Sequence, residues 1–491
     1  MEHFVTILAL MGMVVVVASL LSGALERSAV PVVAVFLALG LILGPWALGL
    51  IDIGFESPAL RVLATLALMM VLFSDGVTLN LKELKPRRRL LTRVLGPGTL
   101  LPAAVIAVAA HYLLGVQAPA AAILGAALTS TDPVLLRNVL RSRALPDNAR
   151  IALRMETGLN DIILLPIVVI AMLVWAPIQS AHGGAPQGVL HSVLGLLLLG
   201  PVLGVIVGWT GISALSWVRR RTGVRRDYES LYALGLAFAA YAAAESVGGS
   251  GFVAAFAAGI VIDAQDSELC DCFLEYGEAT AEMFLLLTFV ALGTTLIWKG
   301  LGIVDWRTLL FAAIALSARS VVLYPMLGGL GLPERDRRLI ALLAPRGLST
   351  LLLALLPVFA GIPGAESLFV VACLVVLISL AVHGGGITWF LRSHAPRVAP
   401  APQAPADVEA PAVPAIPSGL TNVPVRLTLE ELDGLRAAGE RVVIGDSRKD
   451  DVYYTDGRKA EGAIRLDPFD PVLDARTAAV PREATIAVYC A

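Results

Sequence analysis

Charged side chains are scarce in this chain of 491 residues. They make up 15% of it, hydrophobic residues make up 57%, and the mean hydropathy is +0.79. An ordinary soluble protein contains about 25% charged residues, so this composition excludes a wholly soluble protein. It indicates a membrane protein that crosses the bilayer many times.

An excess of charge of one sign is also lacking. The formal net charge is −2, so the overall balance indicates neither a nucleic acid nor an acidic partner. The cysteines are too few and too scattered for a disulfide framework; they are Cys270, Cys272, Cys373 and Cys490. A metal site at Cys270 and Cys272 is disfavoured because no second pair matches this one.

Membrane spans are predicted where about 20 apolar residues lie between short polar turns. The first apolar run lacks a basic segment before it and a clear cleavage site, so we interpret it as a span and not as a signal peptide. This criterion gives about thirteen spans in an all-α membrane fold. They lie at roughly 4–24, 30–49, 59–80, 90–114, 118–138, 151–175, 188–217, 229–247, 250–264, 278–298, 305–326, 337–359 and 366–391.

The placement of Lys and Arg predicts the orientation of these spans. The strongly basic connections are 82–89, 137–150, 219–226 and 335–338, whereas 50–58, 116–119, 176–187 and 360–366 contain neither residue. Basic loops face the cytoplasm. The alternation therefore predicts an odd number of spans, in agreement with thirteen, with the N-terminus outside and the C-terminus in the cytoplasm.

The composition changes after Arg392. Residues 396–417 are rich in Pro and Ala and predict an extended linker. Residues 418–491 are typical of a small soluble α/β domain. Thr428 and Glu431 predict the capping box of a helix, and strands are predicted at Val442–Ile444 and Thr485–Tyr489. We therefore divide the chain into a membrane domain (1–395), this linker and a cytoplasmic domain.

Two acids interrupt the apolar span at 151–175. Glu156 and Asp161 lie within two helical turns, and Asn160 shares a helix face with Glu156. A charge at the bilayer centre costs about 3 kcal/mol on insertion scales, so acids at this depth indicate a functional site. The alternative is a polar cluster that only holds helices together.

Two other spans carry a proline beside a charge: Asp132-Pro133 lies in the fifth and Pro345-Arg346 in the twelfth. Each proline removes a backbone donor, and broken backbone inside a membrane is tolerated where it lines a cavity. Interrupted spans at corresponding places in two halves indicate a transporter binding site. Spans four to six and eleven to thirteen would then be inverted repeats. A pair of simple proline kinks is the alternative.

A carboxylate in such a site can exchange a proton for a metal cation. Partial desolvation raises its proton affinity, and hard oxygen ligands suit a small alkali ion. Asp161, Thr157 and the backbone carbonyls around Thr131 supply such oxygens. Because Asn160 is neutral, one cation would replace one proton at Asp161, and we expect electroneutral exchange. Glu156 needs a cationic partner, for which we expect Arg346.

These residues give the sequence a resemblance to the NhaP-like, electroneutral bacterial branch of the monovalent cation/proton antiporters, which implies a bacterial cytoplasmic membrane. The resemblance covers residues 5–390. The motifs that carry it are Gly40-Leu41-Ile42-Leu43-Gly44-Pro45, Phe73-Ser74-Asp75-Gly76, Thr131-Asp132-Pro133, Glu156 with Asn160-Asp161, Gly249-Ser250-Gly251-Phe252, Arg319 and Pro345-Arg346-Gly347.

The resemblance implies a role for each of these polar residues. Asp161 would bind the ion and the proton, and Thr157, Thr131 and Asp75 would help to ligate the ion. The supporting polar residues would be Glu156, Asn160 and Arg346, with Arg319 as a structural cation and Asp132 compensating a helix-end dipole. Thr157 stands where the family more often has Ser, and Asp75 where it more often has Glu, which leaves the ion preference open. The family fold implies a six-helix transport domain, a dimerisation domain, a homodimer and alternating access.

The cytoplasmic end resembles part of a rhodanese domain. Asp446-Ser447-Arg448, Gly462-Ala463-Ile464 and Val488-Tyr489-Cys490-Ala491 occur in that family's order. Sulfur transfer needs a loop of backbone N–H groups after the cysteine, and only one residue follows Cys490. We therefore expect the tail to be regulatory or vestigial and not an enzyme. A poorly ordered tail is the alternative.

The leading hypothesis is a secondary transporter that exchanges sodium or lithium for protons, with no cofactor. A potassium/proton antiporter shares every motif. A membrane-tethered sulfurtransferase or sulfur sensor is the alternative from another class, but it leaves the buried charges unexplained. A channel is disfavoured because the site is single and titratable and is not a ring of ligands.

Overall fold

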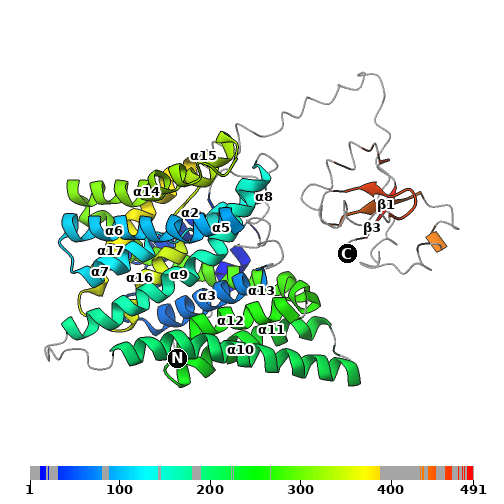
Figure 1. Cartoon of the computed structure of the whole chain (residues 1–491), viewed down its shortest axis with the longest axis horizontal. Helices are drawn as coiled ribbons and strands as arrows, with labels where there is room; N and C mark the ends of the chain where they lie inside the picture. Colours follow the sequence, from blue (N-terminus) through cyan, green and yellow to red (C-terminus); the bar gives the residue numbers. More distant parts are fainter. Residues whose placement is uncertain are drawn as a thin grey trace, which may run out of the picture. The chain divides into compact units, whose positions relative to one another are not determined.

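The computed structural model describes two compact units, Met1–Ala395 and Pro396–Ala491 (Figure 1). In the first unit the described residues are 12–17, 20, 31–79, 88–141, 145–179, 189–222, 224, 226–265 and 267–386. In the second they are 432, 434–435, 441–448, 459–466, 474, 478, 480–481 and 484–489.

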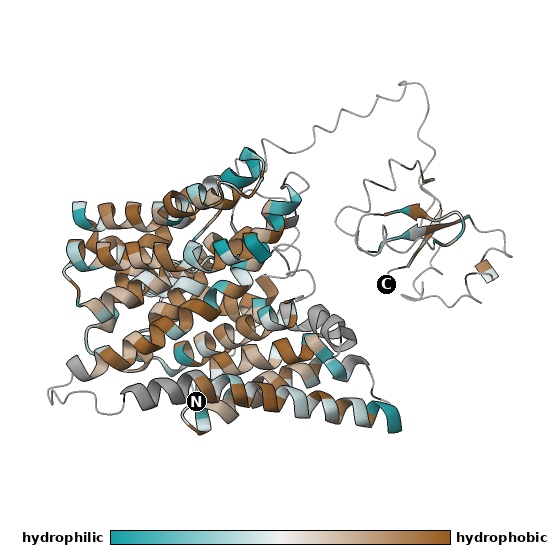
Figure 2. Cartoon of the chain, in the orientation of Figure 1, coloured by the Kyte–Doolittle hydropathy of each residue, from teal (hydrophilic) through white to brown (hydrophobic). Residues whose placement is uncertain are grey.

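The described part of the first unit is helical. Its elements are α2 (Val32–Leu43), α3 (Pro58–Val77), α5 (Arg88–Leu95), α6 (Pro97–Leu114), α7 (Ala118–Ala127), α8 (Pro133–Arg141), α9 (Asp147–Gln179), α10 (Val189–Arg221), α11 (Arg226–Ser246), α12 (Gly251–Gln265), α13 (Ser267–Thr294), η2 (Ile297–Ile303), α14 (Trp306–Met326), α15 (Glu334–Leu342), α16 (Leu348–Phe359), α17 (Ala365–Ser379) and the π-helical turn η3 (Leu380–Gly384). Apolar residues dominate along these helices, and hydrophilic residues gather at many of their ends (Figure 2).

These helices confirm an all-α membrane fold. Among the described residues, six helices are long and apolar enough to cross a membrane, and a bent pair at 279–294 and 297–303 makes a seventh. Four shorter apolar helices, α2, α7, α12 and α16, accompany them. Each predicted span after the first coincides with a helix or a helix pair. Most of the first predicted span, 4–24, lies outside the described residues.

The fifth and twelfth predicted spans are both broken. An unwound stretch, 128–132, separates α7 from α8, and 343–347 separates α15 from α16. Pro133 is the first residue of α8, where its missing N–H costs nothing, whereas Pro345 lies within the second break. The two breaks meet, because the Asp132 N–H donates to the Pro345 carbonyl at 3.0 Å. Crossing broken helices are therefore confirmed.

Close helix packing brings α3 into the middle of the unit. A Cβ atom placed on Gly76 would lie 2.5 Å from the Phe256 carbonyl of α12, and one on Gly259 would lie 2.5 Å from the Phe73 carbonyl of α3. Only glycine allows two helix backbones to approach this closely. The contact fixes the part of α3 that carries Asp75.

The second unit contains a parallel sheet of three strands in the order β2-β1-β3. They are β1 (Val442–Asp446), β2 (Ile464–Arg465) and β3 (Thr485–Tyr489). The two predicted strands are confirmed, and β2 is an addition. The Arg448 guanidinium and the Tyr489 hydroxyl bind Asp446 and hold the pKa of its carboxyl well below its usual range. Thr428, Glu431 and Cys490 lie outside the described residues.

Candidate functional site

Asp132 joins the two broken spans. Its Oδ1 accepts the Val134 N–H at the start of α8, and its Oδ2 accepts the Leu348 N–H at the start of α16, each at 2.8 Å. The first turn of a helix leaves N–H groups unsatisfied and carries partial positive charge. One carboxylate therefore neutralises two helix N-termini at the crossing.

Arg346 reaches from the second break to the first. Its Nη1 donates to the Thr129 carbonyl at 2.7 Å and to the Ser130 carbonyl at 3.2 Å. Its backbone N–H donates to Ser379 Oγ of α17 at 2.7 Å, and this hydroxyl lies 3.2 Å from His383 Nδ1. The guanidinium is completely buried, so it fixes the first break from inside the protein.

Asp161 faces the same break from α9. It is buried, and its Oδ1 accepts a hydrogen bond from the Ser130 hydroxyl, with the two oxygens 2.5 Å apart. Ser349 of α16 and the Asp132 carboxylate are further polar neighbours of Asp161. The described residues give Asp161 no Lys, Arg or His partner at ion-pair distance.

Asn160 and Thr131 present further buried oxygen atoms. Asn160 Nδ2 donates to the Thr129 carbonyl at 3.1 Å. Neither Asn160 Oδ1 nor Thr131 Oγ1 has a hydrogen-bond partner among the described residues. A buried polar atom without a partner is costly. Beside a buried carboxylate, such oxygens fit a site that binds a cation.

Glu156 does not pair with Arg346, so that expectation is wrong. Its carboxylate forms a two-pronged ion pair with Arg319 of α14, and both side chains are buried. Arg319 Nη1 also donates to the carbonyls of Ile340 (2.6 Å) and Ala341 (2.8 Å) at the end of α15. Arg319 therefore holds Glu156 and a helix C-terminus together, while the Arg346 guanidinium is directed to backbone carbonyls.

The remaining predicted residues, Thr157 and Asp75, lie along α9 and α3. The Thr157 hydroxyl donates back to the Arg154 carbonyl at 3.0 Å. A Cβ atom on Gly158 would lie 3.8 Å from Asp75 Oδ1, so the Asp75 carboxylate packs against α9 at Gly158. The structure thus gathers every predicted site residue of the membrane unit around α9 and the crossing.

Sequence reasoning missed the serines of this site. Ser130 binds Asp161, and Ser379 holds the Arg346 backbone. Three consecutive hydroxyl residues, 129–131, in an apolar span were the available signal for Ser130. Nothing in the sequence indicated Ser379, because its role depends on α17 lying beside the second break.

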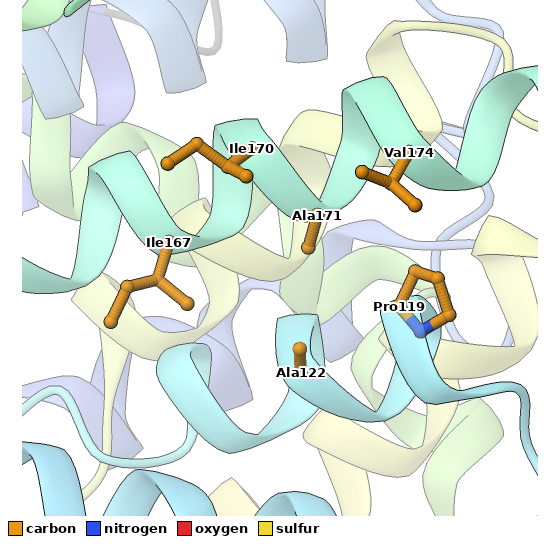
Figure 3. A pocket seen from close by; sticks show the side chains of 6 residues that line it. All are labelled: Pro119, Ala122, Ile167, Ile170, Ala171 and Val174. Atoms are coloured by element: carbon orange, nitrogen blue, oxygen red, sulfur yellow. The ribbon is translucent and has the colours of Figure 1, made fainter. Parts of the chain in front are cut away.

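An apolar groove of about 310 Å³ lies between α7 and α9 (Figure 3). Its lining residues are Pro119, Ala122, Ile167, Ile170, Ala171 and Val174. It offers no polar atom to an ion. Among the described residues there is also no cluster of three or more His, Cys, Asp or Glu that could hold a metal.

Broken crossing spans with a buried carboxylate beside them define the architecture of a secondary transporter. The particular family follows from the sequence model of the transmembrane sodium/hydrogen exchangers, which matches residues 12–393. The chain belongs to this family. The family expected from the motifs is confirmed for the membrane unit.

The curated relatives are named for two different ions, potassium and sodium. The chain is 24% identical to the K(+)/H(+) antiporter NhaP of Alkalimonas amylolytica, over 78% of this chain and 65% of that protein. It is 26% identical to the K(+)/H(+) antiporter NhaP2 of Shewanella sp. strain ANA-3, over 79% of this chain and 66% of that one. It is 24% identical to the Na(+)/H(+) antiporter 2 of Zygosaccharomyces rouxii, over 57% and 36%. The match thus spans less than two thirds of each relative.

Solved structures support the fold. The sodium proton antiporter MjNhaP1 from Methanocaldococcus jannaschii at pH 8 superposes with a TM-score of 0.65 at 20% identity. The match covers 79% of this chain and 98% of that structure. At this level of identity the likeness establishes the architecture.

Proposed function

We propose that this protein exchanges sodium or lithium ions for protons across the bacterial cytoplasmic membrane by alternating access. The observation that carries the proposal is the environment of the Asp161 side chain. It is a buried carboxylate at the crossing of two broken spans, bound by a hydroxyl and without an ion-pair partner among the described residues. A carboxylate in this position can hold either a proton or a cation.

We assign the exchange to Asp161 because Glu156 and Asp132, the other two acids buried at the crossing, already have partners. Glu156 is neutralised by Arg319, and Asp132 is bound to two helix N-termini. Both are therefore held as fixed charges. One cation then replaces one proton, and each transport cycle moves no net charge.

The ion would be bound by oxygen atoms from three elements. Asp161 and Thr157 come from α9, Thr131 from the first break and Asp75 from α3. Asn160, the neighbour of Asp161 in the chain, adds a side-chain oxygen. This oxygen has no hydrogen-bond partner among the described residues. Hard oxygen donors of this kind suit alkali cations. Potassium is the second candidate, because the Alkalimonas and Shewanella relatives are named K(+)/H(+) antiporters.

Transport by the purified full chain in proteoliposomes tests the proposal. A proton gradient reported by a pH-sensitive dye should collapse on addition of Na⁺ or Li⁺, and a larger response to K⁺ would select the second candidate. Clamping the membrane potential with valinomycin and matched K⁺ should leave the Na⁺ response unchanged. A rate that depends on the clamped potential would refute electroneutral exchange.

The remaining proposals concern the oligomeric state, the orientation in the membrane and the C-terminal tail. We propose a homodimer with the N-terminus outside and the second unit in the cytoplasm, and a tail without enzymatic activity. Thiosulfate:cyanide transfer tests the last point, because turnover that is lost in Cys490→Ser would instead indicate a sulfurtransferase. Crosslinking in native membranes tests the dimer, and a monomer-sized product alone would contradict it.

A further inference from the structure

Ser130 lies in the first break, opposite Asp161 of α9. Its hydroxyl donates to Asp161 across the space between the break and α9, with Oγ and Oδ1 2.5 Å apart. Both side chains are buried. An ion that approaches this carboxylate oxygen therefore meets the Ser130 oxygen at the same time.

Two backbone carbonyls of the break, those of Thr129 and Ser130, already accept two hydrogen bonds each. A carbonyl oxygen has two lone pairs. The Thr129 carbonyl accepts from Asn160 Nδ2 (3.1 Å) and Arg346 Nη1 (2.7 Å). The Ser130 carbonyl accepts from Arg346 Nη1 (3.2 Å) and Thr350 Oγ1 (3.3 Å). Neither of these two carbonyls has a free lone pair for an ion, so residues 129 and 130 can offer an ion only side-chain oxygens.

The Ser130 hydroxyl is chemically suited to that task. It carries one proton, which it gives to Asp161, and two acceptor lone pairs. When a cation sits at the carboxylate, the proton can rotate away and the same oxygen can turn a lone pair to the ion. The hydroxyl then serves Asp161 in both halves of the cycle, as a hydrogen-bond donor and as an ion ligand.

We infer that Ser130 Oγ is a direct ligand of the transported monovalent cation and helps to determine which alkali ion is preferred. This inference rests on the proposed exchange function at Asp161. Attraction between an ion and an oxygen grows as their distance shrinks. A hard side-chain oxygen therefore contributes more to binding Li⁺ and Na⁺ than to binding K⁺.

Transport kinetics of Ser130→Ala in proteoliposomes test the inference. The KM for Li⁺ and Na⁺ should rise about tenfold, as for the loss of one contact to a charged group. The KM for K⁺ should rise less, and kcat should stay near the wild-type value because ground-state binding is what is lost. Ser130→Thr keeps the hydroxyl and should retain the wild-type ion preference.

A role as a hydrogen-bond donor alone predicts a different result. Ser130→Ala would then change the KM of every cation by the same factor, and this outcome would overturn the inference, as would unchanged KM values. Thr288→Val is the matched control, because it removes a buried hydroxyl whose one partner among the described residues is the Phe284 carbonyl in α13. If the wild type exchanges none of the three cations for protons, the proposed function itself is wrong.

Discussion

Five buried ionisable side chains lie around the crossing, and their partners separate their roles. Glu156 and Arg319 neutralise each other, Asp132 binds two helix N-termini, and Arg346 binds the carbonyls of the first break. Asp161 is left with a hydroxyl partner. The sequence identified all five residues, because charges in apolar spans stand out. It could not pair Glu156 correctly, since Arg319 and Arg346 are both far away in sequence and only the packing of α14 brings Arg319 to α9.

Removing one partner of the buried ion pair should destabilise the protein. Glu156→Gln leaves the Arg319 charge uncompensated, and breaking a buried pair in this way costs about 3–5 kcal/mol. The midpoint of thermal unfolding, followed by fluorescence-detected size-exclusion chromatography in detergent, should fall clearly. The double variant Glu156→Gln/Arg319→Gln should recover part of the loss.

The exposed pair Glu334–Arg338 provides the control for this prediction. Its side chains are 58% and 63% exposed, so Glu334→Gln should leave the unfolding midpoint almost unchanged. Equal stability of Glu156→Gln and the wild type would show that the Arg319 pair does not hold α14 to α9.

At the scale of elements, the two breaks are joined by hydrogen bonds between Asp132 and the backbone of 345–348. The first break lies between α7 and α8, in the middle span of the group from α5 to α9. The second break lies between α15 and α16, in the middle span of the group from α14 to α17, in agreement with inverted repeats. Pro133 and Pro345 made both breaks predictable, because proline disturbs the helical ladder. The crossing contact was not predictable, since it joins Asp132 to the backbone of 345–348 through a fold that local sequence does not encode.

Gly347 lies at the crossing of the two breaks, where there is no room for a side chain. A Cβ atom at this position would overlap the Asp132 carboxylate, so Gly347→Ala should displace Asp132 from the start of α16. We expect exchange to fall at least tenfold, by analogy with a misplaced catalytic group, while the protein still inserts into the membrane. Initial rates in proteoliposomes measure this. Gly235→Ala is the matched control, because nothing lies within 4 Å of an added Cβ on α11. A fully active Gly347→Ala would contradict the described crossing.

At the scale of the whole molecule, the site belongs to one unit. Every residue assigned to it, from Asp75 to Ser379, lies within Met1–Ala395. Composition alone predicted the change of character after Arg392, and the two strands of the tail were predictable from their β-branched and apolar residues. A regulatory or vestigial role for the tail stays a prediction, because Cys490 lies outside the described residues.

Deleting 396–491 should therefore leave exchange intact. The truncated chain should show the wild-type KM for its cation, because no ligand is removed, and a changed response to cytoplasmic pH would indicate regulation by the tail. Parallel transport assays of the two chains at matched reconstitution levels measure this. Loss of exchange by a truncated protein that elutes as a single symmetrical peak would show that the second unit contributes to the transport step.

The central claim is that Asp161 alone exchanges the proton for the cation, and Asp161→Asn tests it most directly. The variant keeps the size of the side chain but can neither bind a proton nor supply a negative charge. In proteoliposomes with an imposed proton gradient, it should show no cation-driven proton movement, at a protein level equal to the wild type. Asp147→Asn, at an 81% exposed side chain at the start of the same helix, should exchange normally. Cation/proton exchange by Asp161→Asn at the wild-type rate would contradict the mechanism.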